Sequence, residues 1–209
     1  MKKALCIAAA LLLVLLQAQA CGEEAFRRAN SIGNFSEGYA AFSNENGLCG
    51  YIDRTGSVVI EPQWDLADRF SGGVARIGVS RAGASGRLYG YINTAGEIVF
   101  PAVCSAATDF YEGLATVNVD GEYGFITPDG EYAFGGRWSD AGYFSDGMAY
   151  VRVNSLYGFI DHTGAVVIAP AWDDVYSFSE NRAAVEKDGL WGFIDNAGSV
   201  VIEPQYDTG

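Results

Sequence analysis

Short stretches of this chain alternate apolar and polar residues, and tight turns separate them. Residues 114–119 (Leu-Ala-Thr-Val-Asn-Val) and 148–153 (Met-Ala-Tyr-Val-Arg-Val) have the period of two that is typical of half-buried strands. Asp120-Gly121 and Asp188-Gly189 favour two-residue β-hairpin turns, in which both positions need a positive φ. Outside the first 20 residues no segment has the pattern of a helix. The alternation therefore predicts an all-β protein.

One phrase, Gly followed by an aromatic residue, Ile and a polar residue, occurs five times. The leading glycines are separated by 40, 34, 34 and 34 residues, so nearly the whole chain is one unit copied in tandem. A fixed period of this length indicates a repeat array, in which neighbouring copies bury a continuous core by stacking. The glycines are Gly50, Gly90, Gly124, Gly158 and Gly192.

Each copy is predicted to be a three-stranded antiparallel meander. In the fourth copy the strands are residues 148–153, 157–161 and 166–168, and an Asp-x-x-Gly turn joins the last two. The glycine of the second strand is expected to let a flanking aromatic ring lie over bare backbone. A proline is expected to end the third strand, because proline cannot continue a central ladder. These prolines are Pro62, Pro101, Pro170 and Pro204; the third copy has Gly135-Gly136-Arg137 instead, so its third strand should end differently.

The copies begin near residues 35, 70, 110, 144 and 178 and fill residues 35–209. We expect them to form an open, twisted β-solenoid. A closed, propeller-like ring is the alternative fold, although three strands in about 34 residues are few for a propeller blade, which commonly has four strands in about 40 to 45 residues.

Aromatic residues recur at the same places in the copies and are predicted to pack one copy against the next. The alternative is a row of exposed aromatic platforms for sugars. Burial separates the two interpretations, because buried rings favour a protein-contact module and exposed rings favour sugar binding. The residues are Phe35, Phe70, Phe110, Phe144, Phe178, Trp64, Trp138, Trp172 and Trp191.

Residues 1–20 are predicted to be a helical signal peptide. Two lysines precede an apolar stretch at residues 5–16, and residues 18–20 offer a small-x-small cleavage site. The apolar stretch is shorter than the roughly 20 residues of a membrane-spanning helix. Residues 21–34 would be a short linker. We expect a secreted or cell-envelope-associated protein without a transmembrane segment after cleavage; a lipoprotein anchored through Cys21 is the alternative.

Three cysteines remain after such cleavage, namely Cys21, Cys49 and Cys104, so at least one thiol is unpaired or modified. Whether Cys49 and Cys104 pair stays open. Cys49 stands where other copies have an aromatic residue, and we interpret it as a small buried apolar side chain.

The charge balance is strongly acidic, with a formal net charge of −13 for the whole chain. Such a balance argues against nucleic acid and anionic lipid as partners. The second copy departs from it: its first hairpin is lengthened, and no acid occurs from Arg69 through Gly96. Arg76, Arg81 and Arg87 are therefore the candidate contact for an acidic partner or a neighbouring copy, with a solvated loop tip as the alternative.

Candidate catalytic chemistry is sparse. His162 is the only histidine, and we predict that it is an exposed turn residue because other copies place Arg54 or Asn196 there. Asp207-Thr208-Gly209 matches the aspartic-protease tripeptide by chance. The many acids recur as turn residues and form no unique pair for glycoside hydrolysis, nor the Asp-x-Asp-x-Asp spacing of a calcium loop. We therefore expect no catalytic residue, cofactor or metal ion.

The fifth copy carries the phrase Lys-Asp-Gly-Leu-Trp-Gly-Phe-Ile-Asp at residues 187–195, followed by Val-Val-Ile-Glu-Pro-Gln-Tyr-Asp at residues 200–207. From Phe35 to Asp207 the chain resembles the bacterial WG-repeat family, although only Trp191 keeps the name-giving tryptophan. The resemblance implies a β-rich array in exported or envelope proteins that binds or scaffolds without catalysis. A protein-interaction surface is the first functional hypothesis, a carbohydrate or cell-wall binding module the second, and a glycoside hydrolase the third.

Overall fold

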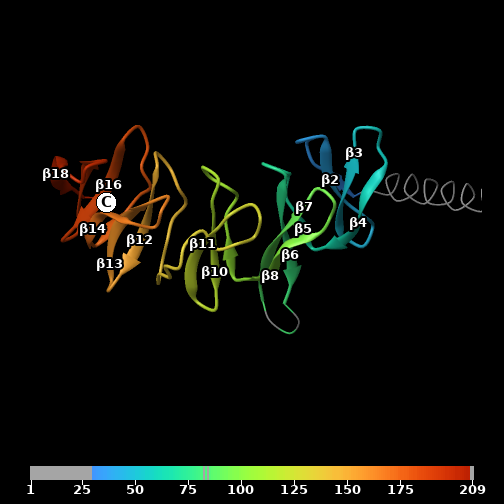
Figure 1. The fold of residues 1–209 in the computed structure, drawn as a ribbon, viewed down its shortest axis with the longest axis horizontal. Coiled ribbons are helices and arrows are strands. Elements are labelled where there is room, and N and C mark those ends of the chain that lie inside the picture. The colour runs from blue at the N-terminus through green and yellow to red at the C-terminus, as the bar shows by residue number, and fades with distance from the viewer. Residues whose placement is uncertain (1–29, 82, 84, 208–209) are drawn as a thin grey trace, which may run out of the picture. The chain divides into compact units, whose positions relative to one another are not determined.

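A computed structural model describes residues 30–81, 83 and 85–207, which form five small antiparallel β-sheets (Figure 1). The predicted signal peptide, Cys21 and most of the predicted linker lie outside the described residues. None of the described residues belongs to a helix that could cross a membrane. The chain divides into two compact units. The first contains the described residues up to Arg87 and also Tyr91–Ile98. The second contains Leu88–Gly90 and the described residues from Val99 onward.

The sheets follow the chain in order, and within each sheet neighbouring strands are neighbours in sequence. The first sheet contains β1 (Ser31–Ile32), β2 (Tyr39–Ser43), β3 (Cys49–Asp53) and β4 (Val58–Trp64). The second contains β5 (Leu66–Ala67), β6 (Val74–Ser80), β7 (Arg87–Asn93) and β8 (Ile98–Cys104). The third contains β9 (Ala106–Ala107), β10 (Ala115–Val119) and β11 (Glu122–Ile126). The fourth contains β12 (Met148–Val153), β13 (Leu156–Asp161) and β14 (Val166–Trp172), and the fifth contains β15 (Asp174–Val175), β16 (Arg182–Lys187), β17 (Leu190–Asp195) and β18 (Val200–Tyr206).

The all-β prediction is confirmed, but the number of strands differs between sheets: three of the five sheets have four strands and two have the predicted three. After the third strand of one copy, the chain passes directly into a two-residue strand that pairs with the first long strand of the next sheet, as β5 does with β6 and β15 with β16. Single-sequence patterns do not detect a strand of two residues, because alternation needs a longer run. The strand count therefore no longer separates the solenoid from the propeller, and the solenoid stays a prediction.

The prediction that proline ends the third strand is wrong. β14 runs from Val166 to Trp172 and contains Pro170 in its interior. The pairing between β13 and β14 shifts register around Gly158, and β14 is an outer strand of its sheet, so the missing proline N–H leaves no ladder position empty. β4 and β18 likewise continue past Pro62 and Pro204.

The reason for the repeated glycine also differs from the prediction. A Cβ atom on Gly158 would lie 2.5 Å from the Ile168 carbonyl oxygen and 2.7 Å from the Pro170 nitrogen, so the backbone of the third strand crosses it, not an aromatic ring. Gly50, Gly90 and Gly192 have the same close backbone contacts. A side chain at these positions would push the third strand away.

The third copy is the exception, as its Gly-Gly-Arg sequence predicts. Here no third strand forms, and on the side away from β10 the strand β11 makes only the isolated bridges Tyr123↔Trp138 and Ile126↔Tyr132. Side chains replace the crossing backbone: Tyr132 Cε1 and Arg137 Nη1 would each lie 3.1 Å from a Cβ atom on Gly124.

Two kinds of turn fix the strands. The predicted hairpin turns are confirmed, with φ of 54° and 89° at Asp120-Gly121 and 51° and 79° at Asp188-Gly189. The phrase that opens each copy is a second hairpin of this kind, with φ of 51° and 81° at Asp146-Gly147 and a bridge between Ser145 and Met148. The sequence analysis did not identify that second turn.

The core of the second unit lies between successive sheets. One buried cluster joins Phe125 of the third copy to Phe144, Val151 and Ile160 of the fourth. A second cluster joins Phe159 and Ile168 of the fourth copy to Phe178, Val185 and Ile194 of the fifth. Neighbouring copies of this unit thus share their buried apolar clusters, which is how a repeat array is stabilised.

Candidate functional site

Most of the recurring aromatic residues lie inside the fold. Phe70, Phe144, Phe178 and Trp64 are buried, whereas Phe110, Trp138, Trp172 and Trp191 are half-buried. Phe35 differs, because half of its surface is exposed. The rings that define the repeat are therefore mostly internal contacts between copies and do not form a continuous row of exposed platforms.

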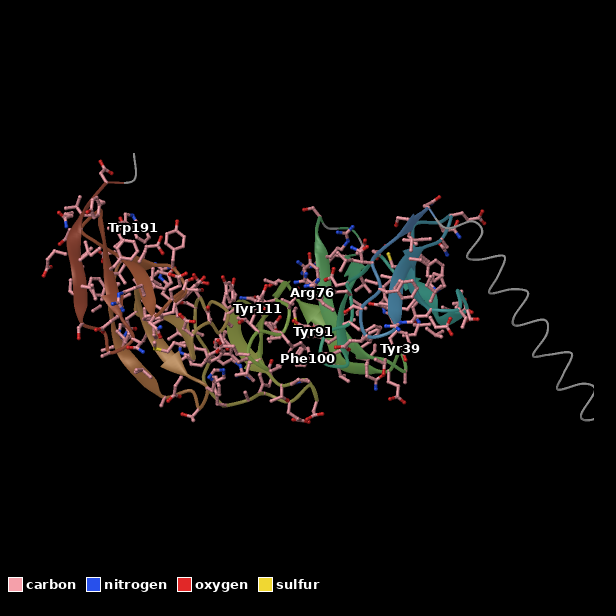
Figure 2. All side chains as sticks on the ribbon, turned by 90° about the horizontal axis from the view of Figure 1, so that it is seen from above. Tyr39, Arg76, Tyr91, Phe100, Tyr111 and Trp191 are labelled. Carbon is pink, nitrogen blue, oxygen red and sulfur yellow. The ribbon has the colours of Figure 1, made fainter. Side chains whose placement is uncertain are left out.

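Exposed rings occur at positions that the copies do not share. In the second unit Tyr111 and Tyr143 stack at a centroid distance of 4.5 Å and an interplanar angle of 33°, and both are exposed. The exposed Tyr176 packs in a similar way on the half-buried Trp191, whose aromatic position recurs in the copies and which is labelled in Figure 2; the ring centroids are 5.1 Å apart and the planes meet at 32°. Tilted pairs of exposed rings can pack against the apolar face of a sugar or a side chain.

Sequence reasoning missed Tyr111, Tyr143 and Tyr176. The available signal was departure from the repeat: four copies have Ser at the position of Tyr111. A residue that replaces the common one at an exposed position is not explained by the packing that all copies share.

The three arginines of the second copy have different environments. Arg76 is half-buried, and its Nε atom donates a hydrogen bond to the Asp68 carboxylate at 2.7 Å (Figure 2). Arg81 and Arg87 are exposed, and the backbone N–H of Arg81 donates to the Gly86 carbonyl at 3.3 Å, where β6 gives way to β7. Arg76 therefore serves an internal ion pair, and the exposed positive charge of this hairpin comes from Arg81 and Arg87.

Two acids, Asp65 and Asp68, lie just before this hairpin in the sequence and precede the acid-free interval from Arg69 to Gly96. Asp68 pairs with Arg76, and the Asp65 carboxylate accepts a hydrogen bond from the Ser80 amide at 2.6 Å. Sheet pairing between β5 and β6 brings these acids alongside the hairpin. The local positive charge is accordingly lower than the three arginines alone suggest.

Two aspartates of the Asp-x-x-Gly turns, Asp53 and Asp161, have depressed pKa values. The Thr163 hydroxyl and amide both donate to one carboxylate oxygen of Asp161, at 2.6 and 2.8 Å, and these hydrogen bonds lower its pKa below the ordinary 3.8. The pKa of Asp53 is lowered in the same way, chiefly by Thr55. A general acid for glycoside hydrolysis needs a raised pKa, so the shifts at these two residues are opposite in direction.

His162 is partly exposed, but it is more than a turn residue. Its ring stacks on Phe144 at 4.3 Å and 24°, and its Nε2 atom lies 3.3 Å from the Glu112 carboxylate. Phe144 and Glu112 both belong to the contact between the third and fourth copies. The position supports a structural role for His162 in that contact.

The two described cysteines are free thiols. Burial raises the pKa of Cys104 to about 11 and also raises the pKa of the half-buried Cys49, so neither resembles a reactive thiolate. Within residues 30–81, 83 and 85–207, no three His, Cys, Asp or Glu side chains gather in a way that could hold a metal ion.

Comparison with protein families identifies the repeat. The family model described as WG containing repeat matches residues 50–79, 89–123, 123–157, 157–191 and 191–208. Each match begins at or next to the aromatic-Gly strand and the central ones run into the following copy, which agrees with the passage of the chain from one sheet into the next. The predicted resemblance is thus confirmed.

Comparison with solved structures finds β-propeller and other proteins at low identity. A computationally designed protein, Ika8, has a TM-score of 0.45 and 16% identity over 82% of this chain, which spans 60% of that protein. The WD40 β-propeller domain of Doa1 has a TM-score of 0.39 and 10% identity over 83% of this chain and 67% of its own. A structure described as the eukaryotic initiation factor has a TM-score of 0.47 and 13% identity over 84% of this chain and 65% of its own. No curated protein matches the chain.

Proposed function

Because the chain belongs to the WG-containing repeat family, we propose that it is a non-catalytic interaction module that binds a partner protein. The burial of the repeated rings carries this proposal. The contacts between copies bury Phe70, Phe144 and Phe178, so the repeated rings form the scaffold. A partner would then be recognised by exposed residues that differ from copy to copy.

The contact that we assign to this function is the β6–β7 hairpin with Arg81 and Arg87. Both guanidinium groups are exposed in a chain with a net charge of −13, so they favour the approach of an acidic segment to this hairpin. Guanidinium groups also form paired hydrogen bonds with carboxylates, which fixes the orientation of such a segment. The expected partner chemistry is an acidic peptide segment.

A labelled peptide of ten glutamates tests this contact by fluorescence anisotropy with the full chain. Arg81→Glu/Arg87→Glu should weaken binding at least tenfold, whereas Arg54→Glu, which changes an exposed arginine in an Asp-x-x-Gly turn, should leave it unchanged. Equal losses in both variants would show that only net charge matters. Absence of binding by the unmodified chain would also reject this site.

Carbohydrate binding is the second candidate. The exposed pair Tyr111–Tyr143 favours it, as does the exposed Tyr176, which packs on the half-buried Trp191. Purified cell-wall sacculi should pellet the chain saturably, with competition by soluble glycans. Tyr111→Ala and Tyr176→Ala should reduce pelleting. Tyr132→Ala is the matched control, because the Arg137 guanidinium already covers that ring at 3.7 Å. If all three variants still pellet with the sacculi, the two pairs are not the sugar site.

Export completes the proposal, with residues 1–20 as the signal peptide. Intact mass spectrometry of chain recovered from a bacterial host should give a mature N-terminus at Cys21. A mass that matches the unmodified residues indicates secretion, and an added diacylglycerol and fatty acyl mass indicates the lipoprotein alternative. Retention of Met1 with the full mass in the cytosolic fraction would contradict export.

A further inference from the structure

Two tyrosines of the second unit stack on each other where the third copy meets the fourth. Tyr111 lies in the opening turn of the third copy and is labelled in Figure 2, and Tyr143 immediately precedes Phe144, which opens the fourth. Their ring centroids are 4.5 Å apart, and the ring planes meet at 33°. The two residues are 42% and 40% exposed, so reagents in the solvent reach both rings.

The pair is a double departure from the repeat. The other four copies have Ser at the position of Tyr111. The position before the opening Phe, which Tyr143 occupies, holds Asn, Arg, Asp and Ser in the other copies. The two unusual residues face each other across one contact between copies, and other copies make that contact without them. The packing that the copies share therefore does not account for the pair.

The residues beside both tyrosines are fixed on the opposite copy. The residue after the first tyrosine is Glu112, whose carboxylate accepts a hydrogen bond from the Gly147 amide at 3.1 Å. The residue before the second tyrosine is Gly142, whose carbonyl accepts a buried hydrogen bond from the Thr116 hydroxyl at 2.7 Å. These anchors hold the two rings together and so raise the effective concentration of one ring at the other.

Two phenols held in this way can be joined by one-electron oxidation. A one-electron oxidant removes one electron and the phenolic proton from each ring, which leaves two phenoxyl radicals with spin density on the ortho carbons. One ortho carbon of each ring then forms a C–C bond with the other, and the hydrogen on each of these carbons moves to the phenolic oxygen as the rings regain aromaticity. The two electrons and two protons reduce hydrogen peroxide to two molecules of water when a haem peroxidase is the oxidant.

We propose that Tyr111 and Tyr143 form an oxidative cross-linking site, at which a peroxidase-type one-electron oxidant joins the two rings as dityrosine. The bond ties the third copy to the fourth across 32 residues of sequence. A cross-link over such a loop stabilises a fold chiefly by restricting the unfolded chain. The proposal goes beyond partner binding, because the oxidation modifies the array itself.

Another tyrosine pair shows how geometry and exposure distinguish this site. The rings of Tyr150 and Tyr157 are 5.7 Å apart and nearly perpendicular, at 79°, so they do not stack face to face. Both residues are half-buried, and burial raises the pKa of each to about 12. Phenols that are less accessible and hold the proton more firmly are oxidised less readily. The second pair should therefore not couple.

Treatment of the full chain, as the expressing host processes it, with a haem peroxidase and hydrogen peroxide tests the proposal. In dilute solution a monomer lighter by two hydrogen atoms should form, with the blue fluorescence of dityrosine. Digestion with trypsin and a glutamate-specific protease should release residues 98–112 joined to residues 138–152. The first of these peptides contains a single tyrosine, Tyr111.

Three tyrosine variants assign the cross-link. Tyr111→Phe and Tyr143→Phe keep the ring contact but remove one phenol each, so each should form about tenfold less of the intramolecular product, because the remaining tyrosine has no phenol held beside it. Tyr132→Phe is the matched control. Tyr132 is 39% exposed, but its ring meets Phe100 edge-on at 5.8 Å and the Arg137 guanidinium at 3.7 Å. This variant should cross-link like the unmodified chain.

Thermal melting measures what the cross-link does to the fold. The purified cross-linked monomer should melt several degrees above the untreated chain, whereas Tyr143→Phe treated in the same way should show no increase. Covalent dimers in place of the intramolecular product overturn the proposal. So does a product that persists in either Phe variant of the pair, or a cross-linked monomer with an unchanged melting temperature. Sugar binding and acidic-peptide binding are measured separately, and Tyr111→Phe keeps the aromatic platform, so either function can fail independently of the cross-link.

Discussion

The Phe144→Ala substitution removes a ring that is 1% exposed and lies where the third copy meets the fourth. The ring packs on Phe125 at 5.0 Å and stacks with His162 at 4.3 Å, so its loss leaves a cavity with walls from both copies. Large-to-small changes of buried aromatic residues cost about 3 to 5 kcal/mol. Phe35→Ala is the matched control: half of that ring is already in water, so its removal should cost about 1 kcal/mol.

Urea unfolding followed by circular dichroism and tryptophan fluorescence measures both losses. With a slope of about 2 to 3 kcal/mol per M for a chain of this size, Phe144→Ala should lower the midpoint by about 1 to 2 M. Phe35→Ala should lower it by less than about 0.5 M by the same conversion. Equal midpoint shifts for the two variants would refute the assignment of Phe144 to the contact between copies.

Three further substitutions or measurements examine the glycine, the turn aspartates and the thiols. Gly158→Ala should lower the melting temperature, since the added Cβ would lie 2.5 Å from third-strand backbone, while Gly135→Ala, with nothing within 4 Å, should not. Hydrogen bonds within its turn lower the pKa of Asp161, so its stabilisation is present above its unfolded pKa of about 3.8 and is lost as pH falls through the folded value. Melting curves from pH 7 to pH 2 should therefore show a shallower acid limb for Asp161→Asn, and identical limbs would contradict this. A thiol reagent at pH 8 should label Cys49 well before Cys104, whose burial raises its pKa to about 11; equal rates would contradict that burial.

The features that follow from local rules were predictable from sequence. The strands at residues 148–153 and 157–161 and the positive φ at Asp120-Gly121 rest on alternation and turn chemistry, which single sequences record directly. The irregular third strand of the third copy was predictable too, because Gly135-Gly136-Arg137 replaces the proline of the other copies. These features need no knowledge of neighbouring segments.

The features that depend on a distant backbone were not predictable. The sequence analysis misjudged where the strand with Pro170 ends and why Gly158 is a glycine. Both depend on a tertiary contact, in which a Cβ atom on Gly158 would lie 2.5 Å from the Ile168 carbonyl oxygen. The ion pair of Arg76 was missed because its partner Asp68 precedes the acid-free interval that seemed to isolate it. The pairing of β5 with β6 brings Asp68 beside Arg76, although the two residues lie on opposite sides of the boundary of that interval in the sequence.

The candidate site was predictable in part, and the reason lies in what a repeat does to a sequence. A position that recurs in every copy has to satisfy the contacts that every copy makes, as Phe178 and the repeated glycines do. Recurrence of a residue is therefore evidence for a role in the fold, and it does not identify the residues that bind a partner. Tyr111 and Arg81 are exposed and occur in one copy each, so the shared packing does not account for them. In an array of this kind, a search for a binding surface should begin with such departures.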